Sequence, residues 1–140
     1  MYTDIVLDHF SNPRNVGIIE NPDGYGKMES EVCGDLMELY IKVDAGKISD
    51  VKFRTFGCAA AIASSSMATE MIKGQPLEVA AELTDDEIVK RMGGLPEAKI
   101  HCSILAVSAL QVALKDYYDR HPEARPKDKV ELERSPRMQA

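Results

Sequence analysis

Residues 37–56 read MELYIKVDAGKISDVKFRTF, and this stretch decides the fold. Its first half alternates between apolar and polar side chains, which is typical of a strand with one buried face. The inward positions of this strand are Met37, Leu39, Ile41 and Val43. Residues 44–47 predict a hairpin turn, after which residues 48–56 return as a second strand. The inward positions of the second strand are Val51, Phe53 and Thr55. One apolar and one polar face indicate an antiparallel sheet that is covered on one side only.

The sequence before the hairpin predicts a short helix and a third strand. Thr3 is a suitable N-cap for a helix that ends near Phe10, with Val6 and Phe10 on one face. Two turn sequences follow, and from Tyr25 the pattern becomes weakly extended. This extended segment supplies the third strand of the sheet.

Helical patterns dominate after the hairpin. Residues 59–72 predict a helix that Gly74 terminates, and Pro76 opens a short one. Thr84 and Glu87 form a capping-box pattern for another helix. A longer helix begins near Ile100, and one flank of it carries Ile104, Val107, Gln111, Leu114 and Tyr118. The predicted fold class is α+β, a three-stranded antiparallel sheet with helices packed on one face.

Length and composition restrict the class of protein. A chain of 140 residues corresponds to one ordinary domain, for which we expect residues 1–120, followed by a polar, partly disordered extension over residues 121–140. The net charge of −6 and the lack of a basic stripe argue against nucleic-acid binding. No uninterrupted apolar run approaches the roughly 20 residues of a membrane span. The N-terminus lacks the basic region of a signal peptide, so we expect a cytoplasmic protein.

Three cysteines carry the chemistry that the sequence offers. Asp35 follows Cys33 by two residues, Cys58 lies between Gly57 and an alanine-rich segment, and His101 directly precedes Cys102. Three thiols, one carboxylate and one imidazole are candidate ligands for a thiophilic metal or an iron–sulfur cluster. An odd number of cysteines also argues against a complete set of internal disulfides. Because the cysteines are far apart in the sequence, only folding can bring them together.

The predicted elements place these candidate ligands at element ends. Cys33 and Asp35 fall at a strand-to-strand turn, Cys58 lies just before a helix, and His101 and Cys102 lie in the first turn of another. Helix N-termini carry unsatisfied N–H groups and partial positive charge, which lower the pKa of a thiol. We therefore expect two of the three thiols to be activated and partly exposed.

Each candidate ligand taken alone has a simpler structural explanation. A single cysteine is more often a small buried apolar residue than a ligand, and a single aspartate in a turn often only shapes the turn. The glycines Gly34 and Gly57 flank two of the cysteines, however, and leave room for a cluster. This combination favours a metal or cluster site. The methionines fit core packing better than ligation.

Four sequence blocks resemble the IscU family of iron–sulfur cluster assembly scaffolds, and the N-terminal domain of NifU equally well. They are DHFSNPRNVG (8–17), VCGD (32–35), FGCAAAIASSS (56–66) and LPEAKIHCSIL (95–105). The resemblance spans about residues 2–119 and implies the same sheet-and-helix fold. It also implies a scaffold or carrier protein rather than an enzyme.

The resemblance further implies how the site is used. Cys33, Cys58 and Cys102 would hold a transient [2Fe-2S] cluster, with Asp35 or His101 as the fourth ligand, and zinc could replace iron in the apo form. The expected partners are a cysteine desulfurase, an electron donor such as ferredoxin, and apo-protein recipients. Cys102 has the longest helix behind it and is our candidate for the first persulfide acceptor. The oxygen ligand of Asp35 is a poor match for the cluster, and we expect it to favour cluster release.

Two departures from the family pattern bear on partners and flexibility. The chain has Ala59 where family members commonly have glycine, which stiffens the loop after Cys58. The chaperone-recognition segment, usually Leu-Pro-Pro-Val-Lys, is Leu-Pro-Glu-Ala-Lys over residues 95–99. A chaperone remains a possible partner, with altered recognition.

Three other functions fit parts of the sequence. Three cysteines with a histidine or an aspartate suit a structural zinc site. A SufU-like sulfurtransferase would use zinc, but it typically has a longer segment before the third cysteine and lacks the neighbouring histidine. A thiol enzyme with His101 as base for Cys102 is the weakest alternative. Adjacent residues of one helix point about 100° apart, so we expect the two side chains to diverge.

Overall fold

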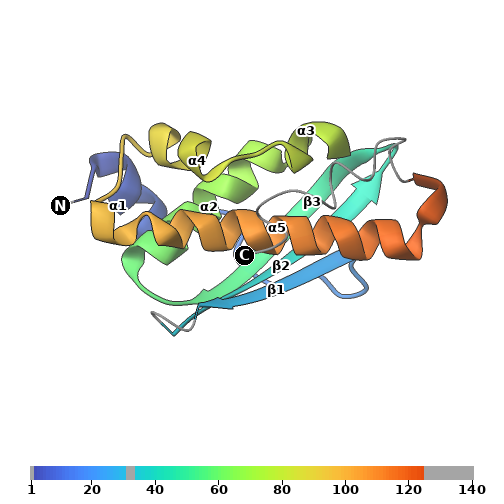
Figure 1. Ribbon diagram of the computed structural model, residues 1–140, viewed down its shortest axis with the longest axis horizontal. Coiled ribbons are helices and arrows are strands. Elements are labelled where there is room, and N and C mark those ends of the chain that lie inside the picture. The colour runs from blue at the N-terminus through green and yellow to red at the C-terminus, as the bar shows by residue number, and fades with distance from the viewer. Residues whose placement is uncertain (1, 31–33, 125–140) are drawn as a thin grey trace.

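The computed structural model describes residues 2–30 and 34–124. Its elements are α1 (Asp4–Ser11), β1 (Gly24–Ser30), β2 (Asp35–Asp44), β3 (Lys47–Phe56), α2 (Ala59–Ile72), α3 (Leu77–Ala81), α4 (Asp85–Arg91), η1 (Glu97–Lys99), α5 (His101–Arg120) and η2 (Pro122–Ala124). The strands form an antiparallel sheet in the order β1-β2-β3, and α2 and α5 cover one of its faces (Figure 1). The predicted α+β fold is confirmed.

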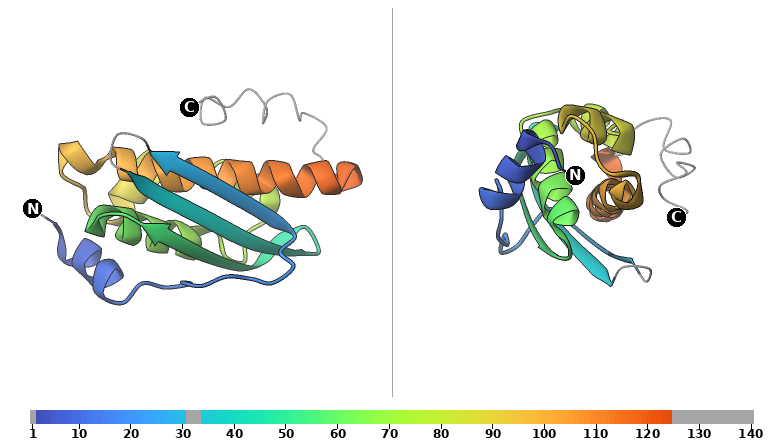
Figure 2. Two further views of the ribbon diagram at one scale, coloured as in Figure 1. Left: turned by 90° about the horizontal axis from the view of Figure 1, so that it is seen from below. Right: turned by 90° about the vertical axis from the view of Figure 1, so that its left-hand side faces the viewer.

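The hairpin between β2 and β3 forms as predicted, and its register brings the inward positions together. Ile41 pairs with Val51 and Leu39 with Phe53, so the inward apolar positions of both strands meet beneath the helices. A bulge between Lys42 and Val43 adjusts the register near the turn. Among residues 2–30 and 34–124, no helix packs on the opposite face of the sheet, and the N-terminal segment runs along the outer edge of β3 (Figure 2).

Local sequence signals fix the helix boundaries. Thr3 caps α1, where its hydroxyl accepts the backbone N–H of Val6 at 3.2 Å. Thr84 and Glu87 form the predicted capping box at the start of α4. Helix α2 ends at Ile72, and Gly74 follows with a φ of 83°, a left-handed conformation that favours glycine. These three predictions are confirmed.

Two side chains that the sequence pattern groups with buried residues of the same helix are exposed. Phe10 is 42% exposed, and His9 is the buried residue one turn beyond Val6. A hydrogen bond between His9 Nδ1 and Ser66 Oγ, 2.7 Å long, joins His9 to α2. Ile104 is 38% exposed, because the face of α5 that packs inward at this end carries Leu105 instead.

Helix α5 packs very closely on β1 because two glycines lie under it. A Cβ atom added to Gly26 would stand 2.1 Å from the carbonyl oxygen of Ala109. One added to Gly24 would stand 2.4 Å from the carbonyl oxygen of Ala113. Only residues without a side chain allow this approach, so both glycines are structural requirements of the sheet–helix contact.

Within the described chain, one segment is long and apolar enough to cross a membrane. It covers Glu97–Arg120, has a mean hydropathy of 1.3 in its most apolar window, and includes α5. Of that window, 61% is buried inside the protein. Length and composition alone are weak evidence here, because a core helix that packs on a sheet passes the same test.

Candidate metal centre

Three candidate ligands converge where α2 and α5 begin. Asp35 is the first residue of β2, Cys58 is the N-cap of α2, and Cys102 lies in the first turn of α5. Their ligand atoms all lie within 4.8 Å of one another. The Cys58 and Cys102 Sγ atoms are 3.6 Å apart, and the Cys102 thiol donates to Asp35 Oδ2 at 3.7 Å. Folding therefore brings together residues that are separated by up to 67 positions.

Gly57 permits the close approach of Asp35. A Cβ atom on Gly57 would stand 2.7 Å from Asp35 Oδ1 and 2.8 Å from its carboxyl carbon. A side chain at this position would push the carboxylate away from the two thiols. The Asp35 carboxylate thus occupies the space that Gly57, which has no side chain, leaves beside Cys58.

The two helices that begin at the site lack side-chain caps. Neither Cys58 at the start of α2 nor Ile100 at the start of α5 makes a capping side-chain hydrogen bond. Helix N-termini favour negative charge, because their first N–H groups have no intrahelical partner. Thiolates or a carboxylate at the site would gain from both helix ends.

Burial opposes the charged form of Cys102. Its side chain is 1% exposed, and burial raises the pKa of the Cys102 thiol, with further contributions from Cys58 and Asp35. The prediction that this thiol is activated and partly exposed was wrong, because desolvation outweighs the helix N-terminus. Cys58 is half-buried, as predicted. A cation at the site would reverse the balance and release the thiol proton.

Cys102 belongs to a small apolar cluster at this end of the protein. Cys102 packs with Ala60 and Ala61, and Tyr2 and Leu95 cover the cluster from two other segments. Contacts of Tyr2 and Leu95 with the cluster did not follow from the sequence, because no local pattern indicates contacts over such distances along the chain. Leu95 begins one of the four family-like blocks, whereas Tyr2 precedes the first of them.

His101 lies closer to Cys102 than expected. Its Nε2 atom is 3.7 Å from Cys102 Sγ, so the prediction that the two side chains diverge was wrong. The length of the imidazole side chain lets its Nε2 atom approach Cys102 Sγ despite the angular separation of the two positions. Among the described residues, the tight group of ligand atoms is formed by Asp35, Cys58 and Cys102, with His101 beside it.

Cys33 lies outside the described residues. The residues on either side of segment 31–33 are near one another, since the Gly34 N–H donates to the Ser30 carbonyl at 2.8 Å. Asp35 is the first residue of β2, so Gly34 directly precedes the site in the sequence. The place of Cys33 among the ligands stays a prediction.

A hollow of about 380 Å³ opens beside Asp35. Its lining residues are Glu29, Ser30, Gly34, Asp35, Leu36 and Phe56. Phe56 is 65% exposed, which places a large aromatic ring at the surface beside the site. The alternation of β3 predicts that the Phe56 side chain points outward, but no sequence pattern assigns a role to Phe56.

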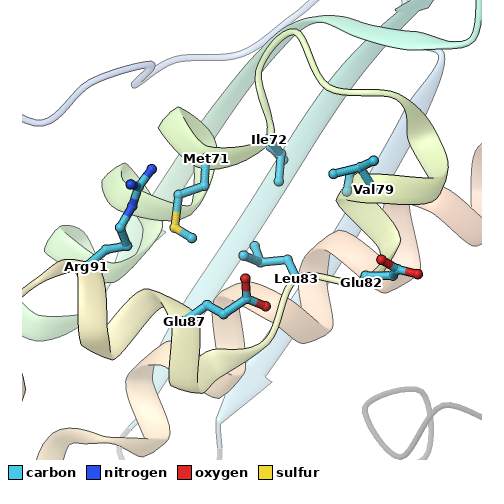
Figure 3. Close-up of a pocket in the computed structure, with 8 residues that line it drawn as sticks. Met71, Ile72, Val79, Glu82, Leu83, Glu87 and Arg91 are labelled. Atoms are coloured by element: carbon cyan, nitrogen blue, oxygen red, sulfur yellow. The ribbon is translucent and has the colours of Figure 1, made fainter.

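A second hollow, of about 260 Å³, lies between α2, α3 and α4 (Figure 3). Its lining residues are Met71, Ile72, Val79, Ala80, Glu82, Leu83, Glu87 and Arg91. No thiol or imidazole is among them, so this hollow does not offer the ligands that a thiophilic metal prefers. The candidate metal centre is therefore the thiol site.

Comparison with known proteins decides the family. The model of the NifU-like N-terminal domain matches residues 1–124. The chain belongs to this family. IscU 1 of Archaeoglobus fulgidus, named an iron–sulfur cluster assembly scaffold protein, is 57% identical over 121 residues, covering 86% of this chain and 79% of the relative. The IscU scaffold protein of Aquifex aeolicus is 52% identical over 118 residues, covering 83% of this chain and 75% of the relative.

Solved structures of family members share the fold. A putative scaffold protein for the SUF system from Fervidobacterium islandicum aligns with a TM-score of 0.67 at 27% identity, covering 81% of this chain and 96% of that one. A NifU-like N-terminal protein from Brucella abortus aligns with a TM-score of 0.66 at 20% identity, covering 84% and 94%. The resemblance to the IscU and NifU family and its implied fold are both confirmed.

Proposed function

We propose that this NifU-like domain is an iron–sulfur cluster assembly scaffold. Its relatives in Archaeoglobus fulgidus and Aquifex aeolicus carry that name, and one in Drosophila melanogaster, 49% identical, is named an assembly enzyme. The observation that carries the proposal is the convergence of Asp35, Cys58 and Cys102 within 4.8 Å. The protein acts as a carrier whose cargo is the cluster, and it turns over no small substrate.

The cargo in this proposal is a [2Fe-2S] cluster held by Cys33, Cys58 and Cys102. Asp35 or His101 supplies the remaining ligand atom. Three thiolates with one oxygen or nitrogen ligand bind iron less firmly than four thiolates, and the weaker ligand gives a recipient protein a point of attack. Iron binds before the cluster forms, and zinc occupies the same thiols when iron is absent.

Sulfur and electrons arrive from partner proteins in this scheme. A cysteine desulfurase transfers sulfane sulfur to a scaffold thiol, an electron donor such as ferredoxin supplies electrons, and apo-proteins receive the cluster. We retain Cys102 as the first acceptor. Cys102 is 1% exposed, so the residues packed around it must move before a donor thiol can reach it.

The chaperone segment is accessible for recognition. Glu97 and Ala98, which replace the usual proline and valine, are both exposed, and Glu97–Lys99 form the short helix η1 before α5. A chaperone that binds here would pull on the start of α5, and hence on Cys102. We assign the scaffold to residues 1–120, with residues 121–140 as an extension, and expect it to act in the cytoplasm without nucleic acid or membrane.

The alternative is a zinc-dependent sulfurtransferase of the SufU kind. The structural similarity to the scaffold protein for the SUF system in Fervidobacterium islandicum favours keeping it. The same thiols would then hold zinc permanently and present one thiol to the sulfur donor. A structural zinc site is a simpler variant of this alternative, with no thiol that reacts.

Metal and sulfide analysis separates these functions. We expect protein purified without oxygen to contain iron and acid-labile sulfide in similar amounts, with visible absorption of a [2Fe-2S] centre, or to acquire both on reconstitution. Stoichiometric zinc that resists replacement by iron and sulfide would contradict the scaffold and support the sulfurtransferase.

A further inference from the structure

The two described thiols of the site are close enough to react with each other. Their Sγ atoms are 3.6 Å apart, whereas a disulfide bond is about 2.05 Å long. Rotation of the two cysteine side chains moves their Sγ atoms by distances of this order, about 1.5 Å. Cys58 and Cys102 begin α2 and α5, which pack against each other, so the thiols are held side by side rather than meeting by chance.

From this geometry we propose that Cys58 and Cys102 are a thiol pair that releases sulfide from delivered sulfane sulfur. The inference rests on the proposed function for the delivery of sulfur. When Cys102 carries a persulfide, the Cys58 thiolate attacks the inner sulfur of that persulfide. The products are a Cys58–Cys102 disulfide and hydrosulfide.

Atoms and electrons balance without an added reductant. The Cys58 sulfur contributes the electron pair of the new S–S bond, and the pair of the broken persulfide bond leaves with the outer sulfur. The sulfane sulfur is thereby reduced to sulfide, and the two cysteines are oxidised to cystine. The proton that the Cys58 thiol gives up ends on the departing outer sulfur of the ionised persulfide, which leaves as hydrosulfide, and the Asp35 carboxylate, within 4.8 Å of both thiol sulfurs, is close enough to relay it.

Burial makes Cys58 the favoured nucleophile. Cys102 is 1% exposed, and Tyr2 and Leu95 pack against the apolar cluster that contains it, so thiols in solution reach it slowly. The Cys58 sulfur is already in contact with the Cys102 sulfur. Placing two reacting groups next to each other replaces a bimolecular encounter with an intramolecular step. Attack on the inner sulfur also expels hydrosulfide, a good leaving group for thiol–disulfide exchange.

The pair changes what the electron donor must do. Its electrons would reduce the Cys58–Cys102 disulfide and return the two ligands, after sulfide has already been released at the site. A metal that binds both thiolates would suppress the reaction, because ligated sulfur is no longer a free nucleophile. Sulfide release and metal loading therefore compete for the same two sulfurs.

The test uses metal-free, fully reduced full-length protein under argon, without reductant. Glutathione persulfide is added in equimolar amount, released hydrosulfide is trapped with monobromobimane, and the unreduced protein is mapped by mass spectrometry. We expect sulfide and the Cys58–Cys102 disulfide in equal amounts. Cys58→Ser and Cys102→Ser should each release roughly tenfold less sulfide or lower still. The surface variant Ile104→Ser, on the same helix as Cys102, should match the wild type.

Three outcomes overturn the proposal. They are a persulfide that stays on the wild-type protein, sulfide release accompanied by a glutathione adduct in place of the disulfide, and undiminished release by either cysteine variant. Reconstitution with iron, sulfide and dithiothreitol tests the proposed function separately, because sulfide is then supplied and the thiols stay reduced. If the protein forms a cluster but does not release sulfide, only the proposal of a reactive thiol pair is refuted. If it releases sulfide but never forms a cluster, only the proposed scaffold function is refuted.

Discussion

The two ends of helix α5 satisfy their polar groups in different ways. At the end nearest the β2–β3 hairpin, Asp116 accepts the backbone N–H of Tyr25 at 2.9 Å. Arg120 donates to the carbonyl oxygen of Pro22 at 3.1 Å and also contacts Asp116. Beneath this half of the helix, Gly24 and Gly26 allow direct contact with β1. This end is closed by contacts within the protein.

At the thiol end, the starts of α2 and α5 have no side chain that accepts a hydrogen bond from their first backbone N–H groups. Helices α1 and α4 are capped by the side chains of Thr3 and Thr84, whereas α3, which follows Pro76, has no side-chain cap. Those that start at the site, α2 and α5, lack such caps and carry Cys58 and Cys102 instead. A missing N-cap costs about 1 kcal/mol. The two ends therefore differ in what satisfies them: contacts within the protein close the hairpin end, whereas thiols stand at the two helix starts of the other end.

The largest expected effect is on metal affinity at the thiol end. Replacing Cys102 by serine removes a thiolate ligand, so zinc should bind on the order of 100-fold more weakly. Loss of a group that only supports a metal ligand already weakens binding by roughly 10- to 100-fold, and loss of the ligand itself should cost at least as much. Competition with a chromogenic chelator measures this. The control Ile104→Ser should bind zinc as the wild type does, and equal affinity in Cys102→Ser would exclude Cys102 from the ligands.

Zinc binding should stabilise the protein, and mainly at one end. A ligand that binds only the folded state adds about 4 kcal/mol at roughly 1,000 times its dissociation constant. We expect a higher melting temperature and slower amide exchange at Gly57 and Cys102, with little change at Val43 and Ile48 near the hairpin. Equal protection at both ends would show that the whole fold tightens. Unchanged exchange after confirmed binding would show a preformed rigid site.

The closed end should be sensitive to an added methyl group. In Gly26→Ala the new Cβ meets the backbone of α5, and we expect a loss of about 3 kcal/mol in the free energy of unfolding. Urea denaturation measures this, with Lys27→Ala, an exposed position on the same strand, as the control. Zinc affinity of the folded variant should be unchanged. A loss below that of the control would mean that α5 can shift away from β1.

A smaller effect is expected at Asp35. Its carboxylate contacts the Cys102 thiol, and an oxygen ligand is a poor match for an iron–sulfur centre. Asp35→Ala should therefore hold its cluster a few times longer and transfer it more slowly. The visible cluster band in the presence of a chelator reports both. A variant that loses its cluster as fast as the wild type, or faster, would exclude Asp35 as the release element.

The smallest effect concerns His9, which lies away from both ends of α5 and makes the free energy of unfolding depend on pH. Burial lowers the pKa of His9 below its ordinary value of 6.5, and the nearby Arg14 lowers it further, whereas Glu70 and Asp8 raise it. The folded state thus favours neutral His9. Its contribution is complete above pH 6.5 and is lost as the pH falls below that value. Stability of His9→Gln should decline less with acid, and parallel pH profiles would refute this.

Local signals in the sequence were sufficient for most of the fold. Alternation from Met37 to Phe56 predicts the hairpin and its buried face, and Gly74 and Thr84 mark helix ends through backbone geometry and capping. These features depend on residues a few positions apart. The exposure of Phe10 did not follow from such patterns, because it depends on how α1 rotates against α2.

The site was predictable in its residues and only partly in its environment. Element ends and flanking glycines indicate that Asp35, Cys58 and Cys102 could meet, which they do. The burial of Cys102 was missed because its cover comes from Tyr2 and Leu95, two distant segments. Helix-end electrostatics can be inferred from sequence, but desolvation depends on the assembled fold, and here desolvation dominates.

Cluster transfer tests the central claim most directly, namely that the thiol end builds a cluster and gives it up. Protein reconstituted without oxygen is separated from free iron and sulfide, then mixed with an apo-ferredoxin in the presence of a chelator. The account predicts that iron and sulfide reach the acceptor together, that holo-ferredoxin forms, and that Cys58→Ser and Cys102→Ser transfer little. Iron captured by the chelator before any acceptor is loaded, or equal transfer by the cysteine variants, would contradict it.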